Sequence, residues 1–184
     1  MSDLFNNENS LDALEAPLAD RMRPQSLDEV IGQNHLLGEE GPLQNMLTSG
    51  IFSSLILWGP PGVGKTTIAR LLAEHSKSHF EQLSAIFTGV SDLKKVFEAA
   101  KIRRTNGHKT IIFVDEIHRF NKSQQDSFLP FLEDGTITLI GATTENPSFE
   151  LNSSILSRVQ VLVLERLTYT NLESLFDRAE SLLG

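Results

Sequence analysis

The 184-residue sequence contains no cysteine. This excludes disulfide bonds, thiolate zinc sites and cysteine nucleophiles, and it suits a protein of a reducing cytosol. Long apolar runs are missing too, because the longest one, around residues 55–58, is far too short to span a bilayer. Residues 1–10 are polar and acidic, without the basic and apolar regions of a signal peptide. We therefore expect a cytoplasmic protein without a membrane segment.

Positive charge is also scarce. Lysine and arginine number 16 against 24 aspartates and glutamates, which gives a formal net charge of −8. The chain thus lacks the global basic field of a dedicated DNA-binding domain. A local basic patch comprises Lys101, Arg103, Arg104, His108 and Lys109. We interpret it as a solvated helix end, because helix C-termini favour cations. The alternative is a nucleic-acid contact.

The rest of the composition is that of a globular domain, with 40% apolar and 22% charged residues. A chain of this length can form one domain that buries about 70% of its unfolded surface. Residues 1–16 are polar and lack a periodic apolar pattern, so we expect them to form a disordered tail. The ordered domain, residues 17–184, is expected to begin near Pro17.

Short apolar runs alternate with longer segments whose apolar residues recur every three or four positions, which predicts alternating strands and helices. The predicted strands are 54–58, 80–85, 110–114, 136–142 and 160–164. The predicted helices are 65–77, 92–104 (capped by Ser91), 122–133, 153–157 and a last one capped by Thr168. Pro130 is expected to bend the third of these helices or to end its regular part. The last helix should bury Leu172, Leu175, Phe176 and Ala179.

This alternation predicts an α/β fold, a doubly wound, mostly parallel five-stranded sheet with helices on both faces. In such sheets ligands bind at the carboxyl ends of the strands. The chemical motifs of the sequence all fall at predicted strand ends.

A glycine-rich segment joins the first predicted strand to the first long helix. Its eight residues match G-x-x-x-x-G-K-[ST] in full. Glycines let backbone N–H groups turn toward phosphate oxygens, and the helix N-terminus adds the positive end of a dipole. Lys65 supplies a mobile charge for the β- and γ-phosphates, and Thr66 supplies a hydroxyl for Mg²⁺. We predict that ATP and Mg²⁺ bind at Gly59, Pro60, Pro61, Gly62, Val63, Gly64, Lys65, Thr66 and Thr67.

Two adjacent carboxylates, Asp115 and Glu116, follow the third predicted strand. We expect this strand to end beside the phosphate loop, so that Asp115 holds Mg²⁺ directly or through water. Glu116 would orient and deprotonate the attacking water. Acidic residues also serve as turn or cap residues after strands, but their combination with the loop favours hydrolysis. A module that only held nucleotide would not need the second carboxylate.

Polar residues also follow the fourth predicted strand, where Thr143 and Thr144 precede Glu145, Asn146 and Pro147. A polar side chain here could contact the γ-phosphate or the attacking water, whereas Asn-Pro equally suits a turn. Arg158 is ambiguous as well, because an arginine near a helix C-terminus is usually surface charge.

In this order, GPPGVGKT, IIFVDEIH, LIGATT and Leu156-Ser157-Arg158 resemble an AAA+ ATPase of the clamp-loader and RuvB branch. Longer segments resemble the replication-associated recombination protein A (RarA) family from about Pro17 to Leu167. These segments are PLADRMRP, IGQ, HRFNKSQQD and GATTENPSFELN.

The resemblance implies roles that the residues alone leave open. Thr144 falls at the sensor-1 position that reads the γ-phosphate, and Arg158 matches the arginine finger that acts on ATP of the neighbouring subunit. Leu18, Ile31 and Gly32 lie in the segment that covers adenine. The family implies a DNA-stimulated, nucleoid-associated ATPase of stalled forks and single-stranded or gapped DNA. Its partners would be single-strand-binding protein and the replication machinery.

The family also has a helical lid with a sensor-2 arginine and a C-terminal oligomerisation domain, neither of which we find before Gly184. We therefore expect the homo-oligomer to be weakened and hydrolysis to be slow, since an arginine finger is worth about 10³–10⁵ in rate. Two alternatives stay open: a truncated ATP-binding interaction module without turnover, and another clamp-loader or RuvB-like motor subunit. A P-loop kinase fits less well, because the adjacent acids and Ser157-Arg158 suit attack by water.

Overall fold

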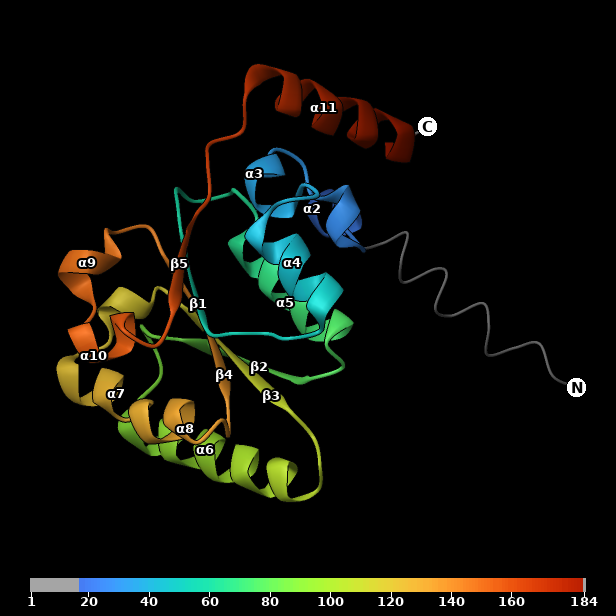
Figure 1. The fold of residues 1–184 in the computed structure, drawn as a ribbon. Helices are drawn as coiled ribbons and strands as arrows, with labels where there is room; N and C mark the ends of the chain where they lie inside the picture. Colours follow the sequence, from blue (N-terminus) through green and yellow to red (C-terminus); the bar gives the residue numbers. More distant parts are fainter. Residues whose placement is uncertain (1–16, 184) are drawn as a thin grey trace, which may run out of the picture.

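A computed structural model describes residues 17–183, and the predicted N-terminal tail lies outside the described residues. The chain forms a five-stranded sheet in the order β2-β3-β4-β1-β5, in which all four neighbouring pairs are parallel (Figure 1). This confirms the predicted α/β class. The strands are β1 Leu55–Trp58, β2 His79–Ser84, β3 Thr110–Asp115, β4 Thr138–Thr143 and β5 Gln160–Val163.

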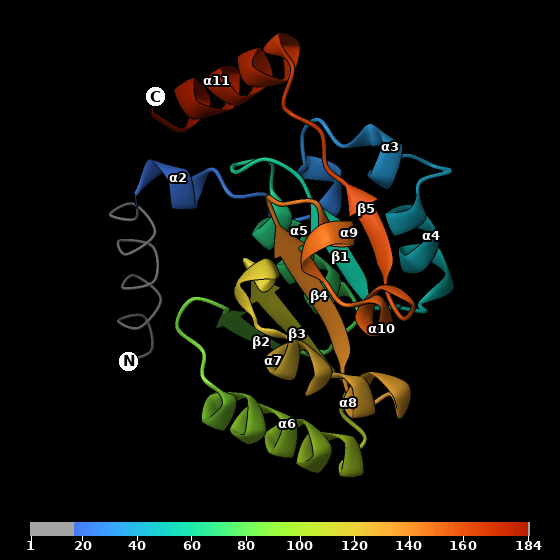
Figure 2. The same ribbon diagram turned by 90° about the vertical axis from the view of Figure 1, so that its left-hand side faces the viewer.

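Helices cover both faces of this sheet, as predicted (Figure 2). One layer contains α4 (Pro42–Ser49) and α5 (Lys65–His75), which bury Leu43, Met46, Ile68 and Leu72 with the apolar side chains of β1. The opposite layer contains α6 (Val90–Thr105), α7 (Lys122–Asp126), α8 (Leu129–Glu133) and α10 (Ser153–Leu156). Fully buried strands such as β3 therefore read as continuous apolar runs.

Several boundaries differ from the sequence prediction. The prediction that Ser91 caps a helix was wrong, because α6 begins at Val90 after Gly89 and Asp92 accepts the Gly89 N–H at 3.1 Å. The predicted helix 122–133 is broken at residues 127–128, and Pro130 sits in the first turn of α8 rather than at the break. Proline is tolerated there because first-turn N–H groups have no intrahelical partner.

The segment before β1 contains short elements that the sequence reading did not predict. They are α2 Leu18–Arg21, η1 Leu27–Glu29 and α3 Asn34–Leu37, in addition to α4. Two more short elements are η2 Ile117–Arg119, in the crossover from β3 to β4, and α9 Pro147–Glu150, which follows β4. No helix within residues 17–183 is both long and apolar enough to cross a bilayer.

The last helix, α11 (Tyr169–Leu183), lies beyond the carboxyl ends of the strands and above α2 (Figures 1 and 2). Thr168 caps it as predicted, since its hydroxyl accepts the Asn171 N–H at 3.3 Å. The predicted apolar side is only partly buried, because Leu172 and Phe176 are 40% and 67% exposed. Polar contacts instead hold α11 in place: Arg178 pairs with Glu29 at 2.7 Å.

Candidate functional site

The glycine-rich loop lies between β1 and α5, at the carboxyl end of the strand. Gly62 and Gly64 have φ angles of 79° and 97°, which side-chain-bearing residues rarely adopt. Gly64 precedes α5 without any side-chain cap. The N–H groups of the first helical turn therefore remain available, and this arrangement is suited to phosphate oxygens.

Lys65 begins α5 and is 8% exposed. Its Nζ donates to the carbonyl oxygens of Gly59 and Pro60, each at 2.8 Å. Burial lowers the pKa of Lys65, and the negative charges of Glu116 and Asp115 act in the opposite direction. The lysine and both carboxylates therefore share one region, as the sequence predicted.

The acidic pair reaches this region from β3, which is not the neighbour of β1. Strand β4 lies between them in the sheet, an order that the sequence prediction did not specify. Asp115 is the last residue of β3, and its Oδ1 accepts the N–H of Glu116 at 3.1 Å. Together with Thr66, in the first turn of α5, Asp115 provides oxygen donors of the type that Mg²⁺ prefers.

Glu116 has left-handed backbone angles, φ 54° and ψ 45°. For a residue with a Cβ this conformation costs about 1–2 kcal/mol. Strain of this kind concentrates at functional sites, where it directs a side chain that regular backbone would send elsewhere. The turn at Glu116 sends the chain from β3 into η2 and leaves its side chain 30% exposed.

Thr143 and Thr144 lie on either side of the end of β4, since Thr143 is the last residue of the strand. Thr143 is fully buried, and its hydroxyl closes the turn by accepting the Glu145 N–H at 3.0 Å and donating to the Glu145 carbonyl at 3.2 Å. Thr144 follows directly and is half-buried at the same edge of the sheet. Asn146 and Pro147 do not form the turn that was one alternative, because Asn146 caps α9 and Pro147 is its first residue. The γ-phosphate role of Thr144 stays a prediction.

His118 is the residue that the sequence reading missed. It lies in η2, with a side chain that is only 7% exposed. Its Nδ1 is 2.9 Å from Thr143 Oγ1 and 3.4 Å from Glu116 Oε2. A histidine two positions after the acidic pair was the only local signal, and nothing in its spacing indicated contact with β4.

A pocket of about 190 Å³ lies beside the loop and beneath α11. Of the three residues predicted to cover adenine, Ile31 lines this pocket. Leu18 does not, although Ala19 in α2 and Met22 just after α2 do. Gly32 does not line it either, although it packs against Leu167, which does: a Cβ on Gly32 would lie 2.6 Å from Leu167 Cδ2. The pocket is also lined by Val63, Gly64, Thr67, Leu175 and Arg178.

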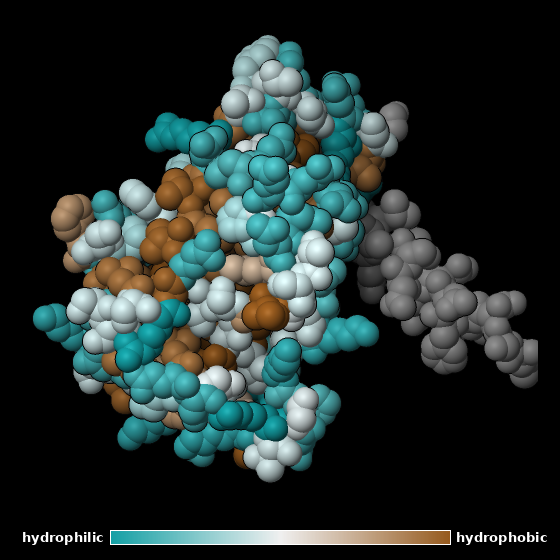
Figure 3. All heavy atoms as spheres, in the orientation of Figure 1, coloured by the Kyte–Doolittle hydropathy of each residue, from teal (hydrophilic) through white to brown (hydrophobic). Residues whose placement is uncertain are grey.

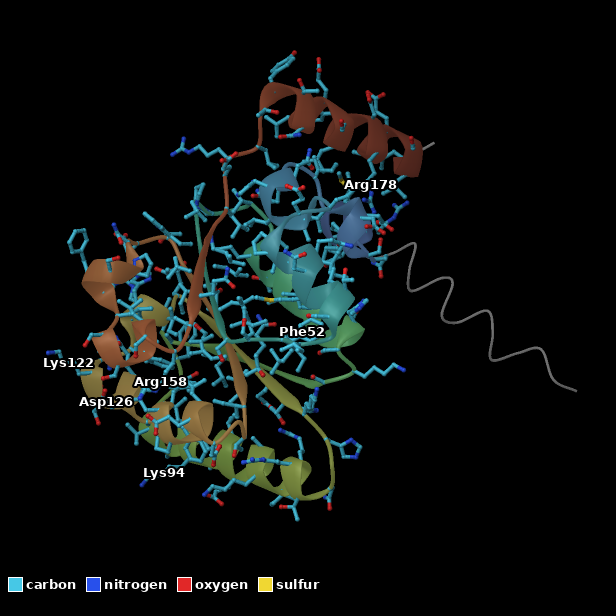
Figure 4. All side chains as sticks on the ribbon, viewed as in Figure 1. Phe52, Lys94, Lys122, Asp126, Arg158 and Arg178 are labelled. Atoms are coloured by element: carbon cyan, nitrogen blue, oxygen red, sulfur yellow. The ribbon has the colours of Figure 1, made fainter. Side chains whose placement is uncertain are left out.

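Arg158 stands apart from all these groups. It precedes β5, and Gln160 at the start of β5 pairs with Leu55 at the start of β1. Because the strands are parallel, Arg158 lies at the amino-terminal edge of the sheet, opposite the phosphate loop. Its guanidinium contacts Ser154 O, Ser157 Oγ and Glu133, the last residue of α8. Figure 4 shows Arg158 on the side of the molecule where α8 and α10 lie.

The basic patch is largely paired with acidic side chains. Lys101 binds Glu98 at 2.8 Å on α6, while Arg103 and Arg104 lie 3.6 and 3.4 Å from Glu81 and Asp134. These contacts at the end of α6 support the helix-end interpretation over a dedicated nucleic-acid site.

Comparison with known proteins places this site in a family. The model of the ATPase family associated with various cellular activities (AAA) matches residues 55–167. The chain is 53% identical over 163 residues to replication-associated recombination protein A of Escherichia coli K12. It is 50% identical over 163 residues to the ATPase WRNIP1 of Dictyostelium discoideum. Both alignments cover 89% of this chain, but 36% and 19% of the respective relatives.

Solved structures share the fold. A variant of Thermotoga maritima RuvB superposes with a TM-score of 0.75 at 30% identity, over 88% of this chain and 55% of that one. The Thermotoga maritima RuvB Holliday junction branch migration motor gives a TM-score of 0.71 at 31% identity over the same shares. The chain thus spans about a third of the length of the recombination proteins that it resembles and about half of RuvB.

Proposed function

Because the chain belongs to the AAA family of ATPases, we propose that it binds ATP with Mg²⁺ at the carboxyl edge of its sheet and hydrolyses it. The observation that carries this proposal is the convergence of Lys65, from the start of α5, with Asp115 and Glu116, from the end of β3. The lysine and the helix N-terminus suit the negative phosphates of a magnesium triphosphate, and the two carboxylates suit its metal ion and the attacking water.

Each residue then has a chemical task. The first-turn N–H groups and Lys65 bind phosphate oxygens, while Thr66 and Asp115 would hold Mg²⁺, which neutralises developing phosphate charge. Glu116 accepts the proton of the attacking water. Thr144 would contact the γ-phosphate from the end of β4, and the pocket containing Ile31 would receive the base.

Arg158 serves a neighbouring subunit in this proposal. Its position at the opposite edge of the sheet prevents it from reaching its own phosphate loop. An exposed apolar surface supports contact between copies: β5 is an edge strand whose Val161 and Val163 are 38% and 48% exposed (Figure 3). ATP hydrolysis would accordingly depend on assembly.

The cellular role is proposed from the relatives. Proteins named for replication-associated recombination and a branch migration motor share this chain's sequence or fold. We infer that hydrolysis responds to forked, gapped or single-stranded DNA, with single-strand-binding protein and the replication machinery as partners. A cytoplasmic, nucleoid-associated location is part of the same proposal.

Steady-state ATPase measurements over a wide range of protein concentration, with and without forked DNA, test this function. We expect turnover that rises more than linearly with protein concentration and exceeds that of the Glu116→Gln variant. Turnover equal to that of the variant at every concentration would contradict it. Molar mass in solution, with and without a slowly hydrolysed ATP analogue, shows whether neighbouring sites form.

One observation favours a second candidate, a nucleotide-binding interaction module. In a single copy Arg158 lies at the opposite edge of the sheet from its own phosphate loop, so a lone copy would bind ATP without help from this arginine and would turn it over slowly. Tight analogue binding, no turnover alone, and turnover on mixing with a full-length relative would favour this candidate. A monomer that hydrolyses ATP well would eliminate it.

A further inference from the structure

His118 joins the ends of two strands on which the proposed chemistry depends. It comes from η2 after β3, and its Nδ1 lies 2.9 Å from Thr143 Oγ1 at the end of β4. The same nitrogen lies 3.4 Å from Oε2 of Glu116. One ring atom therefore faces both a buried hydroxyl and the carboxylate that would activate water.

The surrounding groups decide which ring nitrogen carries the proton. An ionised carboxylate is only an acceptor, so an unprotonated Nδ1 would place its lone pair against that of Glu116. With a proton on Nδ1, the ring donates toward Thr143 and Glu116 together. The Thr143 hydroxyl can then give its own proton to the Glu145 carbonyl at 3.2 Å, which satisfies every group in the chain of contacts.

The His118 side chain is more deeply buried than the Glu116 side chain that it contacts. The imidazole is 7% exposed, whereas the Glu116 side chain is 30% exposed. Thr143 is fully buried and fixed by its two contacts with Glu145. The contacts thus run from the buried end of β4, through one imidazole, to the more exposed carboxylate of Glu116.

We propose that His118 is a positioning residue for Glu116: its Nδ1–H, anchored on Thr143, holds the carboxylate in the direction from which it receives a proton from water. This inference rests on the proposed hydrolysis. It also links Glu116 to the segment that carries Thr144, since Thr143 and Thr144 are consecutive. A change in position at the end of β4 would therefore shift the Glu116 carboxylate through His118.

Three substitutions at His118 separate positioning from packing. In asparagine the amide nitrogen stands near the place of Nδ1, whereas in glutamine it stands near Nε2. We expect His118→Ala and His118→Gln to lower kcat about 10- to 100-fold, the range for a misplaced catalytic group. KM and the Kd of a slowly hydrolysed ATP analogue should stay within about twofold, because His118 contacts neither the loop nor the base pocket in this proposal.

The conservative variants provide the rescue. His118→Asn should recover most of kcat, and Thr143→Ser should keep it while Thr143→Val loses it. His79→Asn is the matched control, since His79 lies exposed at the amino end of β2, far from this edge. Equal loss of kcat in the asparagine and alanine variants, full kcat in His118→Ala, or weakened analogue binding would each overturn the positioning role.

A measurement without turnover keeps this inference separate from the proposed function. Nitrogen-15 NMR of the histidine rings should show the proton on Nδ1 of His118, with that population falling in Glu116→Ala. A protein that carries this tautomer but does not hydrolyse ATP would contradict the proposed function and not the contact between His118 and Glu116. A proton found on Nε2 only, with Nδ1 bare, would overturn the His118 assignment whatever the activity.

Discussion

Arg158 and Glu133 form an ion pair that joins the end of α10 to the end of α8. Both side chains are accessible, at 37% and 53% exposure. Exposed pairs of this kind are typically worth about 0–1 kcal/mol. The pair with Glu133 is therefore weak, and the guanidinium also donates to Ser154 O and Ser157 Oγ of its own subunit. For the proposed action on a neighbour, Arg158 would exchange the Glu133 contact for a phosphate.

Replacing this arginine tests its action between subunits. We expect Arg158→Ala to leave analogue binding unchanged and to lower assembly-dependent turnover by about 10³-fold or more, as for an arginine finger. Mixing Arg158→Ala with Glu116→Gln should restore part of the turnover, because one variant supplies an intact site and the other an intact arginine. A mixture no more active than the sum of its parts, or loss of binding in Arg158→Ala, would indicate a role within one subunit.

Releasing the arginine should have the opposite effect. Glu133→Gln removes the carboxylate that holds Arg158, so turnover at sub-saturating protein concentration should rise by up to about fivefold, the equivalent of about 1 kcal/mol. ATPase assays over a concentration series would detect the change. Glu98→Gln, which breaks the exposed Lys101 pair on α6, should leave the series unaltered. A fall in Glu133→Gln would mean that Glu133 holds Arg158 in its active orientation.

Lys65 makes the most direct prediction about binding. Its Nζ is buried among carbonyl oxygens beside the loop, and charge-assisted contacts are worth about 1.5–3 kcal/mol. Lys65→Ala should therefore weaken Mg²⁺·ATP binding about 10- to 100-fold in calorimetry. Lys94→Ala, an exposed substitution on α6, serves as the charge-matched control. An unchanged Kd in Lys65→Ala would contradict the assignment of Lys65 to phosphate binding.

Substitutions of the two adjacent carboxylates, Asp115 and Glu116, should have different effects on nucleotide binding and hydrolysis. Asp115→Asn should weaken the dependence of nucleotide binding on Mg²⁺, so that chelation of the metal costs the variant less affinity than it costs the parent. Glu116→Gln should bind Mg²⁺·ATP as well as the parent while losing turnover. Titrations with and without a chelator, beside single-turnover hydrolysis, compare them. Identical defects in both variants would argue against separate metal and base roles.

Arg178 tests whether α11 closes the base pocket. Arg178 lies on α11 (Figure 4), and its pair with Glu29 joins this helix to the segment before β1. Both residues line the pocket. Arg178→Ala should speed amide exchange in α11 and raise the nucleotide Kd by up to about fivefold, in keeping with a partly exposed pair. Exchange unchanged in α11 would show that other contacts hold this helix.

Sequence reasoning succeeded where a signal is local along the chain. The loop at Gly62 and Gly64 and the start of α5 depend on residues within one turn of each other, and buried strands reveal themselves by composition. The segment before β1 was harder, because its short helices are held by contacts with distant residues. Gln33, for example, is fully buried through hydrogen bonds with the Glu165 backbone.

The phosphate loop, the acidic pair and the alternation of strands with helices were determined by the sequence itself, because each is written in consecutive or regularly spaced residues. Only the tertiary structure decided that β4 separates β1 from β3, that His118 meets Thr143, and that Arg158 lies at the opposite edge from Lys65. Strand order and crossovers set these distances, and they arise from packing between segments far apart in the chain.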